Sequence, residues 1–515
     1  MFDGIGFAAD KLFYSSYEPE GTVHDIPWYD LEPEAKSVLK CYDFSTKDEK
    51  IFMSSVSSFE TSSNNKSILV RTKNKVRVLD ASLPPNKETL ELKKFNKESG
   101  MIDFDRVHVS IVPIEEWKQM YSEAWRLQRD FFWTRNMSGI NWKKVHDRYF
   151  PLVDRVSTRA EFSDLVWEMQ GELGTSHCYE LGGDYKPRRN YDIGFLGAEF
   201  KYCSDMKCYK IINILKGDLW SGHMTSPMLR PGLNIKEGMF LKAVSGINLT
   251  RMVTPNKCLV HQVNKEIQLS ILDEKGKNKR NVTVKTILNE AKIRYRDWVE
   301  NNREYVHKKT KGKVGYVHIP DMSPFGYSEF HRYFLTEIEY DSLIVDVRFN
   351  GGGHVSQLIL EKLARKRIGY GQSRWMGTDT YPGEAAAGPI VSITNEYAGS
   401  DGDIFSHSFK LMGLGKLIGK RTWGGVIGIW PRNLLVDGTI TTQPEFSFWF
   451  KDVEWDVENY GTDVDIEVDI KPEDYQNQKD PQLDSSILEI SKELKKNPVK
   501  KPSLSKNRPI LKLPN

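Results

Sequence analysis

The amino-acid sequence predicts a multidomain α+β protein in which β-rich, helical and α/β segments follow one another. Three observations indicate this. The chain has 515 residues, which is more than one hydrophobic core usually supports. Its apolar pattern changes from short strand-like runs to helical spacing and then back to strands. Towards its end, apolar strands alternate with helices, which is typical of a largely parallel sheet.

The composition predicts a globular protein of the cytoplasm with no nucleic-acid or membrane partner. Hydrophobic residues make up 39% and charged residues 28% of the chain, and 73 basic against 70 acidic residues leave a net charge of +3. The stretch from Met1 to Asp10 lacks the regions of a signal peptide, and no apolar run is long enough to cross a membrane. The five cysteines do not have the spacing of a disulfide framework.

The first segment, residues 1–82, has the pattern of strands and turns. Apolar residues between Ser67 and Asp80 flank a polar turn, which predicts a hairpin of the kind found in a propeller blade. Because the segment is too short to close a ring, we interpret it as a remnant of β-propeller blades. Residues 83–100 are rich in Lys, Glu and Asn, which predicts a linker.

Residues 101–190 are predicted to form a helical segment. After Pro113 the apolar residues follow helical spacing, and Thr158 with Glu161 has the pattern of a capping box at the start of a second helix. Glycines end that helix shortly before His177, which is therefore expected in a loop just beyond the helix end.

The remaining segments return to strands and then combine strands with helices. Residues 191–288 have Pro/Gly-rich connections between strands, which predicts a small separate β module. Residues 289–490 are expected to form the α/β segment with the parallel sheet. Its last helix begins at Asp480, a capping residue followed by proline. Residues 491–515, rich in Lys and Pro, are predicted to be a disordered basic tail.

A serine follows the apolar strand around Ile390 to Thr394 in the tight turn Ala398-Gly-Ser400-Asp-Gly402, which opens a helix. This placement exposes the Ser400 hydroxyl at the carboxyl end of a strand and directs the amides of the helix N-terminus toward it. The turn is a relaxed form of the G-x-S-x-G pattern of serine hydrolases. The alternative is an ordinary strand-to-helix turn in which Gly, Ser and Asp serve only as caps.

A second glycine turn, Asn350-Gly-Gly-Gly353, follows the apolar strand Leu343 to Val347, and its amides are suited to form an anion hole. The turn lacks the G-x-G-x-x-G spacing and the Lys-Ser/Thr pair of nucleotide-binding loops. Neither H-E-x-x-H nor paired C-x-x-C occurs, which disfavours a zinc peptidase. We expect no metal and no organic cofactor.

A serine nucleophile needs a general base, and eleven histidines are available. The spacing of residues does not select one of them. His177 is preferred because small and polar residues surround it in an open loop. The alternative is that this loop histidine is structural, as most single loop histidines are.

Several motifs in this order resemble the tricorn protease family over about residues 100–495. The resemblance implies that residues 101–190 carry the general base, that residues 191–288 are a PDZ-like module, and that residues 289–490 are an α/β domain of the ClpP/crotonase type, related to C-terminal processing peptidases. The motifs are Gly174-Thr-Ser-His177, Gly232-Leu-Asn-Ile-Lys-Glu-Gly238, Asp346-Val-Arg-Phe-Asn-Gly-Gly-Gly353, Asn395-Glu-Tyr-Ala-Gly-Ser-Asp-Gly-Asp403, Arg421-Thr-Trp-Gly-Gly425 and Val457-Glu-Asn-Tyr-Gly461.

The resemblance also implies roles for individual residues. Ser400 would be the nucleophile and His177 the general base, while Ser176 and Glu458 would support His177 in a serine tetrad. The oxyanion hole would consist of the backbone amides of Asp401 and of the turn from Gly351 through Gly352 to Gly353.

Two features depart from the family. In the family, an acidic residue selects a basic side chain of the substrate, and the corresponding position here is Gly371. This predicts a preference for apolar residues before the cut, or little preference, unless the nearby Asp379 takes the place of that acid. The family carries two propellers before the catalytic part, whereas only residues 1–82 have that pattern here. The chain is thus expected to be a fragment or a split subunit.

We therefore expect a serine peptidase that degrades oligopeptides through an acyl-enzyme, downstream of the proteasome. By resemblance, it would form a homo-oligomer, a hexamer, with aminopeptidases as possible partners. Two alternatives remain. The first is a PDZ-type peptide-binding protein without catalytic activity. The second is an esterase or thioesterase, because a serine, a histidine and an oxyanion hole are not limited to amide substrates.

Overall fold

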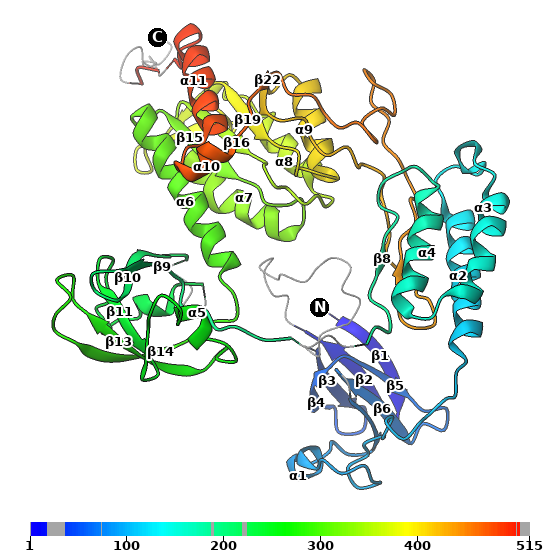
Figure 1. The fold of residues 1–515 in the computed structure, drawn as a ribbon. Coiled ribbons are helices and arrows are strands. Elements are labelled where there is room, and N and C mark those ends of the chain that lie inside the picture. The colour runs from blue at the N-terminus through cyan, green and yellow to red at the C-terminus, as the bar shows by residue number, and fades with distance from the viewer. Residues whose placement is uncertain are drawn as a thin grey trace, which may run out of the picture.

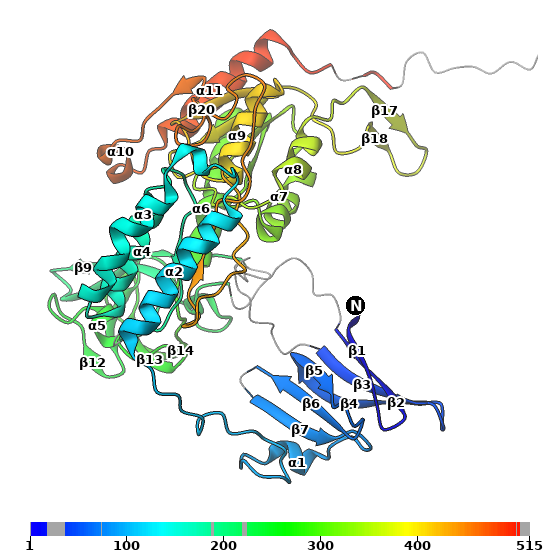
Figure 2. The ribbon, with the colours of Figure 1, turned by 90° about the vertical axis from the view of Figure 1, so that its right-hand side faces the viewer.

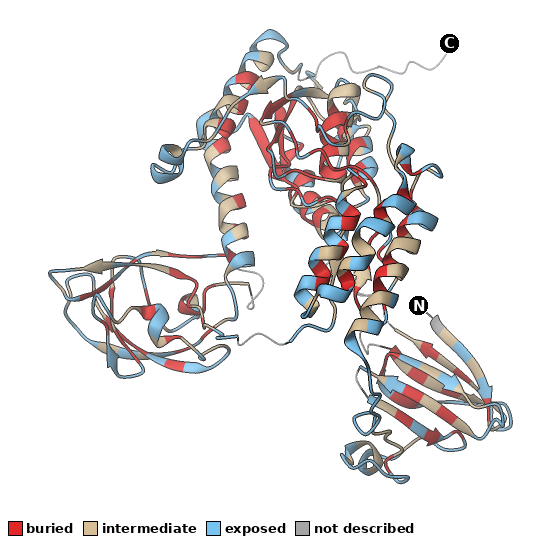
Figure 3. Ribbon diagram, turned by 45° about the vertical axis from the view of Figure 1, so that its right-hand side comes forward, coloured by how far each residue is buried: buried red, intermediate tan, exposed pale blue. Residues whose placement is uncertain are grey.

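Four hydrophobic cores follow one another along the chain, one for each segment with its own sequence pattern. The computed structural model describes residues 2–17, 37–73, 75–186, 190–218, 224–500 and 502–504. Figure 1 shows an N-terminal β body, a group of helices, a β module and an α/β body. Figure 3 shows buried residues inside each of them. The predicted fold class, a multidomain α+β protein, is confirmed.

The N-terminal body consists of two antiparallel sheets that share one core (Figure 2). The predicted hairpin between Ser67 and Asp80 is confirmed, although residue 74 in its turn lies outside the described residues. The expected linker contains the short helix α1 (Lys87–Glu91), which Asn86 caps. The strands are β1 (Phe2–Ala8), β2 (Lys11–Ser16), β3 (Ser37–Asp43), β4 (Asp48–Val56), β5 (Ser58–Thr61), β6 (Ser67–Thr72) and β7 (Lys75–Asp80).

The helical segment has both helices that the sequence predicts, and the capping box of Thr158 and Glu161 is present. A helix between them was not expected from the apolar spacing. The elements are α2 (Pro113–Phe131), η1 (Met137–Gly139), α3 (Trp142–Tyr149), η2 (Phe150–Arg155) and α4 (Arg159–Gly171). After α4 the chain enters the short strand β8 (Glu180–Leu181), which pairs with β21 (Ile440–Thr441) and ties this segment to the C-terminal part of the chain.

The β module is a sheet in the order β14-β13-β11-β10-β9, with β12 paired to β11. Strand β9 therefore lies at an edge. The elements are β9 (Ala198–Cys203), β10 (Cys208–Ile214), η3 (Pro227–Leu229), β11 (Phe240–Val244), β12 (Ile247–Asn248), α5 (Pro255–Cys258), β13 (Glu266–Leu272) and β14 (Arg280–Lys285).

The α/β body is built on a parallel sheet in the order β15-β16-β19-β20-β22, as the alternating pattern predicts. Every residue of β15, β16 and β19 is buried, because helices cover the sheet. The elements are α6 (Ala291–Thr310), β15 (Val314–His318), α7 (Pro324–Glu337), β16 (Ser342–Asp346), α8 (Ser356–Leu363), β17 (Gly369–Gln372), β18 (Thr378–Tyr381), β19 (Ile390–Thr394), α9 (Asp401–Leu411), β20 (Gly415–Gly419), β22 (Ile466–Glu467), α10 (Pro472–Gln476) and α11 (Pro481–Lys496).

The last helix corrects the predicted start of the tail. Helix α11 continues to Lys496, so residues 491–496 are helical rather than disordered. The reason is that Ile490 is fully buried and Leu494 packs against the α/β core, which holds the last turn in place. Of the rest of the expected tail, residue 501 and residues 505–515 lie outside the described residues. Over the described part of the chain, no helix has both the length and the hydropathy of a membrane span.

A buried ion pair fixes the end of β16 next to the glycine turn. Arg348 Nη2 lies 2.6 Å from Asp346 Oδ2, and Arg348 Nη1 lies 2.8 Å from Asp480 Oδ2 at the start of α11. Tyr316 also donates its hydroxyl to Asp346 Oδ2 at 2.8 Å. Two charged residues of the motif Asp346-Val-Arg-Phe-Asn350 are thus structural. They hold the strand end from which the glycine turn starts.

Candidate active site

Ser400 occupies a strained turn between β19 and α9. Its backbone angles are φ 56° and ψ −123°, a region that residues with a side chain rarely adopt. This sharp turn from strand to helix is the geometry that exposes a nucleophile in serine hydrolases. Helix α9 begins at the next residue, Asp401, so the positive end of its dipole lies beside the Ser400 hydroxyl.

The glycine turn packs directly against Ser400. A Cβ atom on Gly352 would lie 2.5 Å from Ser400 Cβ, so only glycine fits there. Asn350 holds the two turns together: its carbonyl accepts the Gly399 amide at 3.0 Å, and its side-chain Nδ2 donates to the Ile319 carbonyl at 2.8 Å. The predicted anion-binding turn and the predicted nucleophile turn are therefore neighbours.

The amides of the two turns differ in what they bind. Gly351 N donates to the Pro320 carbonyl at 3.1 Å, and Gly352 N donates to Asn350 Oδ1 at 2.9 Å. Among the residues that the structure describes, the amides of Gly353 and Asp401 have no acceptor. These two amides are available to a substrate oxygen. The Asp401 side chain instead points into the protein, where it accepts the Ser356 hydroxyl at 2.5 Å.

His177 follows α4 in a loop, as predicted, and is only 8% exposed. Its ring makes edge contact with Trp423 at a centroid distance of 5.6 Å. Thr442 fixes the backbone on the other side by donating its hydroxyl to the His177 carbonyl at 2.5 Å. Burial lowers the pKa of His177 below its ordinary value, while the negative charge of Glu458 acts in the opposite direction. Burial thus favours the neutral imidazole.

Glu458 and Ser176 form the hydrogen-bond network behind His177. Ser176 Oγ lies 2.8 Å from His177 Nδ1 and donates to Glu458 Oε2 at 3.1 Å. Because an ionised carboxylate only accepts, the Ser176 hydroxyl must accept from His177 Nδ1–H, which leaves the lone pair on Nε2. Four further groups donate to Glu458: Thr175 Oγ1, Ser176 N, Val426 N and Ile427 N, at 3.0, 2.7, 2.7 and 3.1 Å respectively.

Asp403 connects the nucleophile helix to this network. Its fully buried carboxylate accepts the Gly424 amide at 2.9 Å and the Gly425 amide at 3.3 Å. The next two amides along the chain, Val426 and Ile427, are the ones that bind Glu458. Desolvation raises the pKa of Asp403 to about 6. The sequence motif contains this residue, but nothing in its local pattern indicates that it holds a loop.

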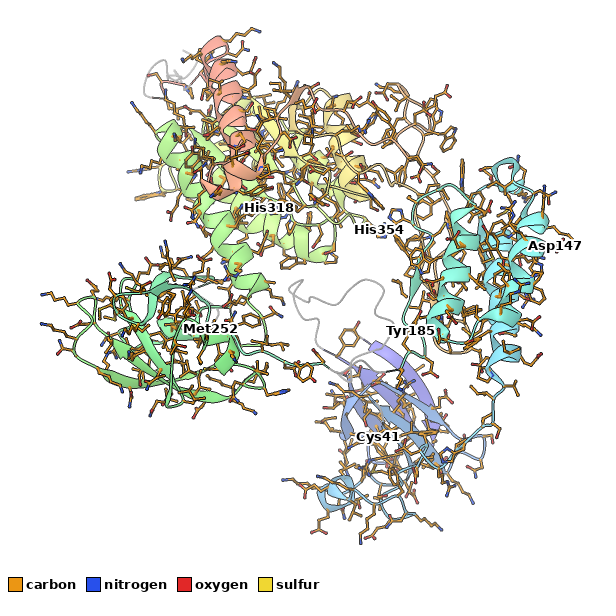
Figure 4. All side chains as sticks on the ribbon, viewed as in Figure 1. Cys41, Asp147, Tyr185, Met252, His318 and His354 are labelled. Atoms are coloured by element: carbon orange, nitrogen blue, oxygen red, sulfur yellow. The ribbon has the colours of Figure 1, made fainter. Side chains whose placement is uncertain are left out.

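A cavity of about 740 Å³ brings the predicted residues together. Ser400, His177, Asp401, Gly351 and Gly353 line it, whereas Gly352, Ser176 and Glu458 do not. Figure 4 labels His354, which also lines the cavity. One wall is apolar, and sequence reasoning did not identify it. Its signal is the phenylalanine at every second position of Phe446-Ser-Phe448-Trp-Phe450, and all three phenylalanines line the cavity.

Gly371, the predicted specificity position, does not line this cavity. It lies exposed on β17, directly opposite Asp379 of β18 in an antiparallel hairpin. Figure 2 shows the hairpin extending away from the sheet of the α/β body. The tip of the hairpin carries Trp375 and Met376, which are 85% and 80% exposed. The structure thus pairs the two candidate specificity residues with each other rather than with Ser400.

Comparisons with known families cover each segment after the N-terminal body. The family model of the tricorn protease C1 domain matches residues 113–171, that of the tricorn protease PDZ domain matches residues 194–289, and that of peptidase family S41 matches residues 313–468. The three matches follow the order of the helical segment, the β module and the α/β body.

Individual proteins match over nearly the whole chain. A putative tricorn-like protease C-terminal subunit of Sulfurisphaera tokodaii is 45% identical over 91% of this chain and 54% of its own length. The tricorn protease of Thermoplasma acidophilum is 41% identical over 91% of this chain and 42% of its own length. A crystal structure of the tricorn protease superimposes with a TM-score of 0.87 at 38% identity, over 96% of this chain and 46% of the other.

The chain spans about half the length of the curated relatives it matches. Among the described residues, no group of three or more His, Cys, Asp or Glu side chains is arranged to hold a metal ion. Three family models match successive segments of the chain, and two relatives named as tricorn proteases are more than 40% identical to it. Both observations indicate the same family. By these similarities, the chain belongs to the tricorn protease family and carries a peptidase family S41 domain.

Proposed function

We propose that the chain is a serine peptidase that hydrolyses oligopeptides, with Ser400 as nucleophile and His177 as general base. The observation that carries this proposal is the position of both residues in one cavity, beside two backbone amides that have no acceptor among the described residues. The membership of the chain in a peptidase family supports the same reaction class.

The proposed reaction begins when Ser400 Oγ attacks the scissile carbonyl carbon and its proton passes to His177 Nε2. Ser176 and Glu458 stabilise the positive charge that forms on the imidazole, the task of aspartate in the Ser-His-Asp triad. The amides of Asp401 and Gly353 would bind the oxyanion, and each such donor contributes about 3 kcal/mol to transition-state stabilisation. His177 then protonates the leaving amine, and water hydrolyses the acyl-enzyme by the reverse proton transfers.

The proposal also includes the role of the glycine turn, the substrates, the oligomeric form and the partners. Gly351 and Gly352 would shape the oxyanion hole through the backbone rather than donate to the substrate, because their amides are already bound. We further propose oligopeptides as the substrates, action downstream of the proteasome, a homo-oligomer as the active form and aminopeptidases as partners that complete the degradation.

The division into functional segments is proposed from the sequence patterns and supported by the separate cores. Residues 101–190 supply the base, residues 191–288 form the PDZ-like module, and residues 289–490 supply the nucleophile. The supporting acid also comes from the last of these segments. The site therefore requires two segments to be in contact, and the strand pair β8–β21 holds them together.

Labelling with a fluorophosphonate probe, followed by peptide and ester substrate panels, tests the proposed function. We expect Ser400 to be labelled and fluorogenic peptides to be cleaved, with peptide hydrolysis lost in Ser400→Ala and retained in Ser204→Ala, an exchange on the exposed surface of the PDZ-like module. Circular dichroism confirms that each variant is folded. Undiminished turnover in a folded Ser400→Ala variant would refute the nucleophile, and hydrolysis of esters alone would favour an esterase.

A further inference from the structure

The PDZ-like module has a cavity of about 500 Å³ between its edge strand and a short helix. Strand β9 has β10 as its only strand neighbour in the described sheet, so one edge of its backbone is open. Helix α5 borders the cavity on the other side. Apolar side chains of Phe195, Leu196, Phe200 and Leu259 line it. An extended peptide that pairs with an open edge strand uses this kind of groove.

A backbone amide at the beginning of β9 binds a carboxylate of the same chain. Gly197 precedes the strand with φ +63°, and a Cβ there would lie 2.8 Å from Ser226 Cα, so the turn requires glycine. Its N–H donates to Glu290 Oε1 at 2.8 Å. Backbone amides of this kind are the groups with which peptide-recognition domains capture a C-terminal carboxylate. Here, the captured carboxylate is a side chain.

The Glu290 carboxylate is held firmly in this position. Its side chain is 10% exposed, and Oε2 accepts Arg294 Nη2 at 2.7 Å and Nε at 3.0 Å. Arg294 also binds Glu199 of β9 at 2.8 Å, so the guanidinium links the edge strand to the start of α6. Glu290 and Arg294 both line the cavity.

A peptide carboxylate at Gly197 would meet the charge of Glu290. Two of the neighbouring amides are already bound, because Gly194 N donates to the Leu259 carbonyl and Phe195 N to the Ile287 carbonyl, both at 2.9 Å. Two carboxylates that share one amide repel each other, and one of them must leave or become protonated.

We propose that Glu290 occupies, from within the chain, the position in which this module would bind the terminal carboxylate of a peptide. The module is then closed to free C-termini while Glu290 stays on Gly197. When Glu290 withdraws, the Gly197 amide and the Arg294 guanidinium are the donors for an incoming α-carboxylate, and the apolar cavity takes the last side chain. The ligand class is a peptide with a free C-terminus and an apolar final residue. This binding is separate from the proposed hydrolysis.

Fluorescence anisotropy with two labelled decapeptides tests the proposal. Both end in Leu-Val, one with a free carboxylate and one with a C-terminal amide, and every protein carries Ser400→Ala so that hydrolysis does not consume the probes. In this parent chain we expect equal, weak binding of both peptides. Glu290→Ala is expected to bind the free carboxylate at least 10-fold more tightly than the amide. Glu266→Gln, the loss of an exposed glutamate on β13, is expected to behave like the parent.

The measured preferences decide whether Glu290 closes the module to free C-termini. A parent chain that already prefers the free carboxylate 10-fold would overturn the proposal, as would a folded Glu290→Ala variant with no preference. If Glu290→Ala does not fold, Glu290→Gln keeps an acceptor for Gly197 and removes the charge, and it is expected to show the same preference to a smaller degree. Hydrogen exchange in the parent chain gives an independent measurement: the Gly197 amide is expected to be protected, and rapid exchange would contradict its bond to Glu290.

Discussion

The Ser176 hydroxyl donates to the Glu458 carboxylate over 3.1 Å and thereby determines which nitrogen of His177 can act as a base. Since Ser176 Oγ also lies 2.8 Å from His177 Nδ1, the proton of the neutral imidazole stays on Nδ1. Nε2 then carries the lone pair that accepts the nucleophile's proton.

Ser176→Ala is expected to lower kcat by about 10- to 100-fold without unfolding the protein. The exchange removes a hydrogen bond to a group that becomes charged in the transition state, and such bonds contribute about 1.5–3 kcal/mol. Thr175→Val is the matched control, because it also removes one donor to Glu458 but leaves the link to His177 intact. We expect a smaller loss from this control in the same peptide assay. Equal losses in both variants would mean that Ser176 has no special role.

The pH dependence of kcat/KM is expected to have its acidic limb below the ordinary histidine range. Burial lowers the pKa of His177, and the base works only when it is neutral, so activity is retained until the pH falls through this lowered value. Glu458 raises the pKa of His177, so Glu458→Gln should shift the limb to still lower pH while it reduces the maximal rate. A limb that moves upward in Glu458→Gln would contradict the assignment.

The contribution of Asp403 to stability is expected to decrease as the pH rises from 4 to 7. Burial raises its pKa to about 6, above the ordinary value of 3.8, so ionisation favours the unfolded chain. The stability that the protonated form provides is present below pH 3.8 and lost as the pH passes through 6. Two pKa units correspond to about 3 kcal/mol.

Thermal unfolding of the wild type and of Asp403→Asn between pH 4 and 8 measures this effect. Asparagine does not ionise, so the difference in stability should shift in favour of the variant as the pH rises. At pH 7 the peptidase activity of Asp403→Asn is expected to fall, because the Gly424 and Gly425 amides bind different oxygens of Asp403 and Asn replaces one of these oxygens by an NH2 donor. A difference in stability that does not change with pH would show that Asp403 has an ordinary pKa.

Those parts of the fold that are determined by residues close together in the sequence were predictable. The hairpin of β6 and β7, the capping box of Thr158 and the parallel strands around β16 all follow from local apolar spacing and from caps. The turn at Ser400 was predictable for the same reason, because a Gly-rich connection between a buried strand and a helix leaves few conformations. Helix α3 was missed, because its apolar residues Trp142 and Val145 are too few to give a clear period.

Which residues meet in the site depends on contacts between segments that are far apart in the sequence. Spacing alone could not pair His177 with Ser400, because β8 and β21 bring their segments together. Which amides of the glycine turn are free depends on Pro320, whose carbonyl binds Gly351. Local sequence carries no signal for such contacts. Local pattern singled out Ser400, the glycine turn and His177, and the resemblance to a family added Ser176 and Glu458, whereas the geometry indicates what each of them binds.

The side-chain preference of the peptidase is the last prediction, and it rests on the apolar wall of the cavity and on Gly371. Phe446, Phe448 and Phe450 line the cavity, and no acidic side chain of the β17–β18 hairpin does. A carboxylate that faces a substrate cation discriminates because an unmatched side chain leaves the charge unpaired, a penalty of about 2–5 kcal/mol. Without that carboxylate, we expect apolar residues before the cut to be preferred, or little selection.

A positional-scanning peptide library measures this preference for the wild type, Gly371→Asp and Asp379→Ala. If position 371 faces the substrate during catalysis, Gly371→Asp should move the preference toward Lys and Arg, because it restores the acid of the family. Asp379→Ala is the control, since Asp379 lies opposite Gly371 in the hairpin and is the acid that could take its place. Strong selection for Lys or Arg by the wild type, abolished by Asp379→Ala, would refute the argument from Gly371 and identify Asp379 as the substitute acid.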